Sequence, residues 1–151
     1  MFKRIFLILL FVNVTHCGFV PINIANNKNI TIQNIKIIGG DRKLNIFLQK
    51  NLERYQQNIS ENLFNITINS SYEKKVISKN AAGAATKYQL KATANFEIQY
   101  NNTINNVSFI ETFNIDHSSD DFENRSYENS LKENFANSIA QKLIFKLLSL
   151  L

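Results

Sequence analysis

The sequence has few of the residues that build disulfide-linked or metal-binding folds. Its 151 residues include one cysteine, Cys17, and two histidines, His16 and His117. A single cysteine excludes an internal disulfide framework. No Cys/His spacing typical of a zinc site occurs, and the sequence lacks both the glycine-rich phosphate-binding loop and the dinucleotide-binding fingerprint. We therefore expect no cofactor and no metal, and an exported enzyme without a recognisable motif is a weaker alternative.

Long hydrophobic runs are also missing after Val12. A membrane-spanning helix needs about 20 consecutive apolar residues, and no later stretch is long and apolar enough.

Charge of one sign is not concentrated in the sequence either. The formal net charge is +5, and it falls by two if Lys3 and Arg4 are removed with a signal peptide. A mildly basic chain of this kind does not indicate a nucleic-acid partner.

The first residues have the order of a secretory signal. Two cations, Lys3 and Arg4, precede an apolar run over residues 5–12, and the lone Cys17 follows. A signal that ends at a single cysteine looks like a bacterial lipoprotein signal, in which that cysteine carries the lipid. We predict a signal peptide over 1–16. We also predict that Cys17 carries acyl chains, palmitate among them, that anchor the protein to a membrane. His16 departs from the usual Gly or Ala, and the alternative is an ordinary cleaved signal with Cys17 incidental.

The remaining chain predicts a tether over 17–29 and one domain over 30–151. Residues 30–38 are β-branched and strand-like, with an apolar phase change at Asn34 that a bulge or an edge position would explain. Asp41 is a helix cap, and an apolar stripe at helical spacing then runs to about Gln57.

Two long strands follow, and the second shows the clearest pattern in the sequence. From Tyr88 to Tyr100 the even-numbered residues are apolar or small and the odd-numbered ones polar, a period that only a strand has. An Ala-Gly segment, 81–85, is expected at the hairpin end before it. The Asn101-Asn102 turn then leads into a last strand over 104–115.

A polar loop is expected over 116–125, followed by a final helix capped by Ser126 with apolar residues every fourth position. The predicted order is β-α-β-β-β-α. We expect an α+β fold, a two-layer sandwich with two amphipathic helices on one face of a four-stranded, mostly antiparallel sheet.

Five segments together resemble the LptE family of lipopolysaccharide-assembly lipoproteins. Cys17-Gly18-Phe19-Val20-Pro21 looks like the mature start of that family, and the helix from Asp41 to Arg54 resembles its leucine- and arginine-rich segment. Residues 83–90, Gly-Ala-Ala-Thr-Lys-Tyr-Gln-Leu, are similar to its GxATRYxL run before the long strand. Residues 113–116 and 133–143 are similar to its closing pattern. In the order and spacing of these segments, the chain resembles a divergent, alphaproteobacterial-like member of the LptE family.

The resemblance implies an outer-membrane lipoprotein without enzymatic activity. Such proteins lie inside the β-barrel translocon LptD as a plug, help the barrel to assemble, bind lipopolysaccharide and assist its transport to the outer leaflet. The expected location is therefore lipid-anchored through Cys17, facing the periplasm and inside the barrel lumen. The alternative is a periplasm-facing lipoprotein that binds another ligand or protein in envelope assembly.

Candidate ligand-binding residues follow from the implied ligand. Lipopolysaccharide carries phosphates, which lysine binds well, and the two long strands carry Lys75, Lys79, Lys87 and Lys91. The simpler alternative is that these lysines keep an exposed sheet soluble. Lys74 lies on the same strands, and Lys132 is a weaker candidate expected on a solvated helix face. His117 lies among carboxylates, which could in principle bind a metal. A solvated turn is the simpler interpretation of this cluster.

Overall fold

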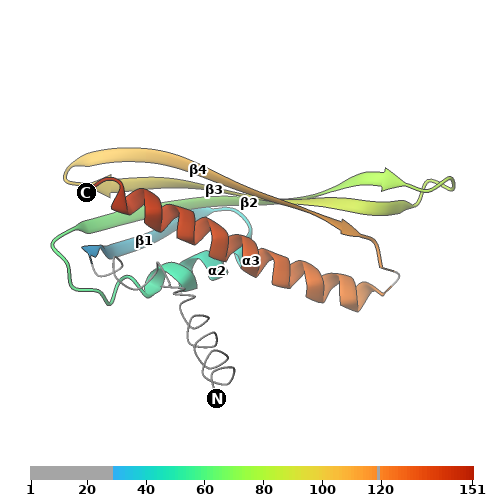
Figure 1. The fold of residues 1–151 in the computed structure, drawn as a ribbon, viewed down its shortest axis with the longest axis horizontal. Helices are drawn as coiled ribbons and strands as arrows, with labels where there is room; N and C mark the ends of the chain where they lie inside the picture. The colour runs from blue at the N-terminus through green and yellow to red at the C-terminus, as the bar shows by residue number, and fades with distance from the viewer. Residues whose placement is uncertain (1–28, 119) are drawn as a thin grey trace, which may run out of the picture.

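The computed structural model describes residues 29–118 and 120–151, which form two helices and four strands (Figure 1). In chain order the elements are β1 (Thr31–Gly39), α2 (Arg42–Glu53), β2 (Leu63–Lys79), β3 (Ala85–Tyr100), β4 (Thr103–Asp116) and α3 (Asp121–Leu148). The predicted order β-α-β-β-β-α is confirmed. The predicted signal peptide over 1–16, the lipidated Cys17 and the tether as far as residue 28 lie outside the described residues.

The four strands form one mixed sheet in the order β1-β2-β3-β4. β1 runs parallel to β2, whereas the β2–β3 and β3–β4 pairs are antiparallel. Helices α2 and α3 lie side by side on one face of the sheet, and the β2–β3 hairpin extends beyond them (Figure 1). This arrangement confirms the predicted two-layer α+β sandwich with a mostly antiparallel sheet.

The core lies between the sheet and the two helices. The alternation read in the sequence places Leu90, Phe96 and Ile98 of β3 in this core with at most 2% of each residue exposed. Leu44 and Leu48 of α2 are fully buried against the sheet. The long helix α3 contributes a stripe at helical spacing: Leu131, Phe135, Ala136, Ile139, Ala140, Leu143, Ile144 and Leu147.

β1 has both of the features that the phase change at Asn34 predicted. It is an edge strand, and its pairing with β2 shifts register between Ile32 and Asn34. The extra residue of this bulge lets both Ile32 and Ile35 face the core side of the sheet although their sequence parity differs. The predicted Asn101-Asn102 turn is also confirmed, because both residues have positive φ values, 47° and 62°, as a tight hairpin requires.

Both predicted helix boundaries need correction. α3 begins at Asp121, because the Asp120 carboxylate accepts hydrogen bonds from the backbone N–H groups of Phe122 and Glu123. Ser126 therefore lies inside the helix and caps nothing, and the predicted loop over 116–125 is much shorter. The first turns of α3 are largely exposed, so they carry no apolar periodicity. α2 is shorter than expected and ends at Glu53, where Tyr55 N–H bonds the carbonyl of Leu52 in a tight turn.

No helix within residues 29–118 and 120–151 has the length and apolar character needed to cross a membrane.

Candidate functional site

The sheet face opposite the helices is polar over most of its length. The odd-numbered residues of β2 and β3 lie on this face, and the even-numbered residues of β4 join them through the β3–β4 register. A shallow trough of about 370 Å³ crosses it, lined by Ile38, Thr67, Asn69, Asn95, Glu97, Asn106 and Ser108 among others. We call this surface the open sheet face. It confirms that Asn95, Glu97 and Gln99 point away from the core, as the alternation predicted.

Side-chain amides recur along the open sheet face, among them Asn65, Asn69, Asn95, Gln99 and Asn106. Asn34 Nδ2 donates a hydrogen bond of 2.9 Å to Asn65 Oδ1 across the β1–β2 pair. Amide side chains both donate and accept hydrogen bonds, so such a surface is compatible with water or with another polar surface.

The hairpin places three of the four candidate lysines on this same face. Lys75 of β2 lies opposite Gln89 of β3, and Lys87 and Lys91 flank Gln89 two residues to either side. Diagonal neighbours of this kind are about 7–8 Å apart, within reach of long side chains. Lys79 lies nearer the hairpin tip, beyond two register shifts of the β2–β3 pair. The structure thus brings Lys75, Lys87 and Lys91 together and leaves Lys79 at the margin.

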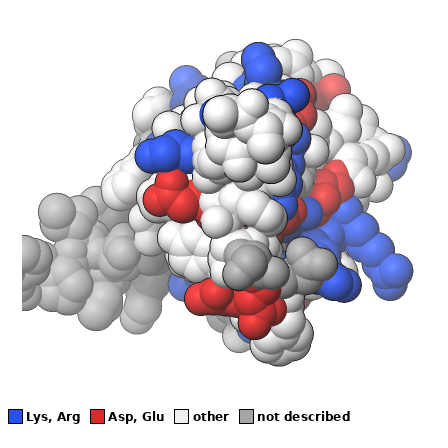
Figure 2. All heavy atoms as spheres, turned by 90° about the vertical axis from the view of Figure 1, so that its right-hand side faces the viewer, with Lys and Arg blue, Asp and Glu red and all other residues white. Residues whose placement is uncertain are grey.

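Carboxylates partly balance this lysine group. Lys87 Nζ lies 3.3 Å from Asp116 Oδ1, and both side chains are exposed. Lys91 lies opposite Glu73 in the β2–β3 register. Figure 2, which looks onto the hairpin end of the molecule, shows Lys and Arg side chains interleaved with Asp and Glu. Exposed pairs of this kind contribute little to stability, so the lysines remain available to an anionic ligand.

Lys74 and Lys132, in contrast, lie on the helix side of the sheet. Lys132 is 8% exposed, and its ammonium forms a 2.9 Å ion pair with Asp41 and lies 3.8 Å from the centre of the Tyr72 ring. The expectation of a solvated helix face at Lys132 is therefore wrong. Lys74 pairs with Glu128 of α3 at 2.9 Å and lies 4.7 Å from the Tyr88 ring centre.

The Lys74–Glu128 pair joins α3 to β2, whereas the Lys132–Asp41 pair joins α3 to the start of α2. Asp41 also caps α2 by accepting a 2.8 Å hydrogen bond from the Leu44 N–H. Partial burial acts to raise the pKa of Asp41, but the Leu44 N–H and the Lys132 ammonium outweigh it, so the pKa lies below its usual value. Burial and the carboxylate of Glu128 raise the pKa of Tyr72, so this phenol stays neutral.

Replacing Lys132 with Met should destabilise the fold by about 1–2 kcal/mol, because the ion pair is lost while Asp41 remains partly hydrated. The depressed pKa of Asp41 stabilises the parent at neutral pH, and this contribution is lost as the pH falls through the folded-state pKa. The Lys132→Met variant should therefore lose less stability than the parent on acidification below about pH 4. Urea unfolding across pH measures both effects, with the exposed Lys50→Met as control. Parallel pH profiles for parent and variant would contradict this assignment.

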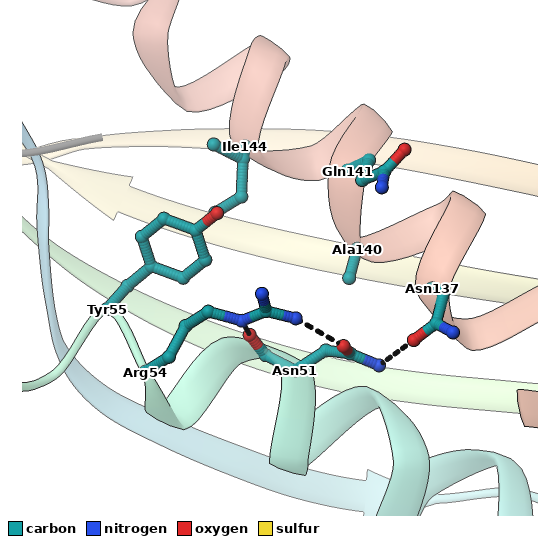
Figure 3. A pocket seen from close by; sticks show the side chains of 7 residues that line it. All are labelled: Asn51, Arg54, Tyr55, Asn137, Ala140, Gln141 and Ile144. Atoms are coloured by element: carbon teal, nitrogen blue, oxygen red, sulfur yellow. Dashed lines mark hydrogen bonds between the residues drawn. The ribbon is translucent and has the colours of Figure 1, made fainter. Parts of the chain in front are cut away.

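A groove between α2 and α3 is a feature that the sequence did not reveal (Figure 3). Its volume is about 300 Å³, and Asn51, Arg54 and Tyr55 of α2 and the following turn line one wall. Arg54 donates hydrogen bonds to the backbone carbonyl and the side-chain Oδ1 of Asn51, at 2.8 and 2.6 Å. Asn51 Nδ2 in turn donates to Asn137 Oδ1 of α3 at 2.7 Å. The sequence predicts both helices but not which of their polar side chains meet.

These contacts involve three of the polar residues that line the groove. The guanidinium of Arg54 and the amide of Asn51 are held by each other and by Asn137, so they join the two helices. The groove is therefore a helix–helix contact in which polar residues replace apolar ones near the surface.

His117 lies just beyond the end of β4. It is exposed, its backbone N–H bonds the Thr86 carbonyl, and its ring meets the Tyr88 ring edge-on with 5.8 Å between centroids. No group of three potential metal ligands occurs among residues 29–118 and 120–151. The cluster around His117 is a strand end followed by a helix cap.

Comparison with known proteins defines the fold. No family model and no curated protein matches the chain. Among solved structures, rare lipoprotein B from Shewanella oneidensis aligns with a TM-score of 0.58 at 12% identity, over 78% of this chain and 98% of that one. A minor lipoprotein from Acinetobacter baumannii aligns with a TM-score of 0.50 at 12% identity, over 74% and 91% of the two chains.

A third structure of the same kind is lipoprotein B from Nitrosomonas europaea, with a TM-score of 0.50 at 11% identity over 79% of this chain and 84% of that one. The described domain therefore has a fold found in small bacterial lipoproteins, and it corresponds to nearly their whole length. At these identities the likeness establishes the fold alone.

Proposed function

We propose that this chain is an outer-membrane lipoprotein, without enzymatic activity, that plugs and helps to assemble an LptD-type β-barrel. In this proposal it is anchored through Cys17, faces the periplasm, and lies inside the barrel lumen. There it binds lipopolysaccharide and assists its transport to the outer leaflet. The fold shared with bacterial lipoproteins and the sequence resemblance to the LptE family both support this role.

The open sheet face is the observation that carries the proposal. The interior of a transmembrane β-barrel is polar, so a plug needs a polar surface to meet it. Most antiparallel sheets that are covered on one side face water on the other, and a polar face alone would fit that simpler arrangement. The same face here combines amides along its length with lysines at the hairpin end, which suits both a polar lumen and an anionic ligand.

Identifying the proteins that accompany the full chain in membranes tests the proposal. The chain should be purified from native membranes in mild detergent, and its companions should be identified by mass spectrometry. The proposal expects a large outer-membrane β-barrel in stoichiometric amount. Recovery of a soluble periplasmic protein or of the chain by itself, from membranes that contain the barrel, would favour the alternative envelope role.

Reversing the charge of two hairpin lysines should weaken lipopolysaccharide binding. Well-formed contacts between a charged group and phosphate are worth about 1.5–3 kcal/mol each, and less where the charged side chain is exposed, as in Lys79 and Lys87. The double variant Lys79→Glu/Lys87→Glu should therefore bind roughly tenfold less tightly or worse. Lys75 and Lys91 support the same contact. Binding should also weaken with rising salt, because screening acts strongly on exposed charges. Titration with purified lipopolysaccharide at low and high salt measures both effects.

The matched control changes the net charge equally at a distance from the hairpin. Arg42 and Lys50 are both exposed on α2, and Arg42→Glu/Lys50→Glu should leave the affinity close to that of the parent. Both double variants should fold, since all four side chains are exposed. Unchanged affinity in the folded hairpin variant would remove these lysines from the ligand site and leave the barrel contact unaffected.

A further inference from the structure

The two edges of the sheet differ in how well they are protected from pairing with another strand. Native sheets block their edges with short strands, bulges, charges or proline. β1 has three of these devices: it is 9 residues long, it has two register shifts, and it carries Lys36. β4 is 14 residues long and pairs with β3 without a register shift from Thr103 to Asp116. It contains no proline, lysine or arginine.

Alternate residues of β4 offer free backbone groups along its outer edge. In a hairpin with a two-residue turn, the pair next to the turn, here Tyr100 and Thr103, is hydrogen-bonded, and hydrogen-bonded pairs then recur at every second residue. The odd-numbered residues of β4 therefore bond β3. The even-numbered ones, from Ile104 to Asn114, direct their N–H and C=O groups outward, and no strand of the described residues meets them.

Apolar side chains lie along both sides of this edge. On the open sheet face, Ile104 and Ile110 are 59% and 52% exposed. On the helix side, Phe145 of α3 is 57% exposed. It lies one turn beyond Lys142, whose ammonium binds Glu111 of β4, so it belongs to the side of α3 that faces the edge strand. Exposed apolar groups on both sides of an unpaired strand are typical of a protein contact.

Charge does not oppose pairing of this edge with itself. Residues 103–110 carry no charge. Glu111 is the first charged residue of β4, and its carboxylate is held by Ser138 and Lys142 of α3. A second copy of the same strand can therefore approach without like-charge repulsion.

We propose that β4 pairs antiparallel with β4 of a second copy of this chain, about a two-fold axis at Val107. This register places Ile104 opposite Ile110 of the partner subunit. The two-fold axis generates the same contact a second time, with Ile110 opposite Ile104 of the partner subunit. It is the only antiparallel register that brings these two exposed isoleucines together. The free backbone groups of Asn106 then meet those of Ser108 of the partner subunit, as the hydrogen-bonding phase of the edge requires. Thr103 lies opposite Glu111 of the partner subunit, which avoids contact between two carboxylates.

The paired form joins two four-stranded sheets into one continuous sheet. Because the wall of the barrel surrounds the proposed plug, we place the paired form outside the barrel, where the edge of β4 is free. Self-pairing can thus fail while the barrel proposal holds, and the reverse is also possible.

Single cysteines along β4 test the register in the full chain, with Cys17 changed to Ser so that the introduced thiol is the only one. Val107→Cys places each thiol opposite its own copy, where Cα atoms in antiparallel pairs are about 4.5–5.5 Å apart, as a disulfide requires. Asn105→Cys and Phe109→Cys are controls on the same face of the strand. In the proposed register position 105 of one copy lies opposite position 109 of the other, so each introduced thiol is about 13 Å along the strand from the same thiol in the second copy. Under mild oxidation, Val107→Cys should form a disulfide-linked dimer at least tenfold faster than either control.

A substitution at the edge provides a second, independent measurement. Ile110→Lys places a charge opposite Ile104 of the partner subunit, and the two-fold axis repeats it. The change leaves the fold intact, because the Ile110 side chain is exposed in the single copy. Sedimentation of the parent should show a dimer, and the folded variant should sediment as a single copy. Equal cross-linking at positions 105, 107 and 109, or a parent that stays a single copy at high concentration, would overturn the proposal. Pairing of the edge with a strand of a different protein would overturn it as well.

Discussion

Truncating Phe96 to Ala is expected to lower the free energy of unfolding by about 3–5 kcal/mol. Phe96 of β3 is 2% exposed, and its ring lies 6.0 Å from that of Phe109 on the neighbouring strand. β3 is a central strand with a partner on each side, so the surrounding structure has little freedom to collapse into the cavity. A loss of this size is a large part of the stability of a small domain.

Glu97 is the matched control for this prediction. It is the next residue of the same strand, but it is exposed on the open sheet face, and Glu97→Ala should change stability by no more than about 0.5 kcal/mol. Urea unfolding of the parent and both variants measures the difference directly. Similar losses for the two changes would mean that the faces of β3 are assigned incorrectly.

Replacing Gly40 with Ala should be nearly as damaging, by about 3 kcal/mol or more. Gly40 forms the turn between β1 and α2 with a φ of 107°, a backbone conformation that residues with a side chain rarely adopt. A Cβ atom here would lie 1.9 Å from the backbone carbonyl oxygen of Ser70 in β2. Because the obstacle is the backbone of a buried strand, the turn itself must move, and the Asp41 cap and α2 would be displaced with it.

Two other glycines serve as controls that separate the effect of the Cβ clash on stability from the effect of the positive φ. Gly83 has a φ of 82°, but a Cβ there would meet no atom within 4 Å, so Gly83→Ala should cost only about 1–2 kcal/mol of backbone strain. Gly39 has no positive φ, and its Cβ would lie 3.2 Å from the Asn69 side-chain oxygen, which can move aside. Thermal unfolding should rank Gly40→Ala as the most destabilised of the three. A Gly40→Ala protein as stable as Gly83→Ala would contradict the close packing of this turn.

The sequence predicted those parts of the fold that depend on local periodicity. The alternation from Tyr88 to Tyr100 identified a strand and both of its faces, because one face is buried and the other is not. The break in phase at Asn34 predicted a bulge or an edge position, and β1 has both. Asp41 was identified as a cap, since its carboxylate satisfies a backbone donor within its own helix.

Features that depend on contacts between distant segments could not be read from the sequence. Lys132 is separated by 91 residues from Asp41, and only the packing of α3 against α2 and β2 turns a surface lysine into a buried one. The cap at Asp120 was missed because Ser126 offered an equally good local signal nearer the apolar stripe. Of the candidate lysines, the alternation placed Lys87 and Lys91 on the polar face, whereas the position of Lys75 beside them depends on the β2–β3 register.

Photo-cross-linking from the open sheet face tests the barrel contact most directly. A photoreactive residue at Asn95 or at Gln99, both exposed on β3, replaces a side chain that the core does not use. In cells that contain the barrel, irradiation should join the full chain to a large outer-membrane β-barrel protein from at least one of the two positions, and the adduct should be absent without light. Failure to capture a barrel from these positions and from a full set of surface positions, while the barrel is present, would contradict the proposed function.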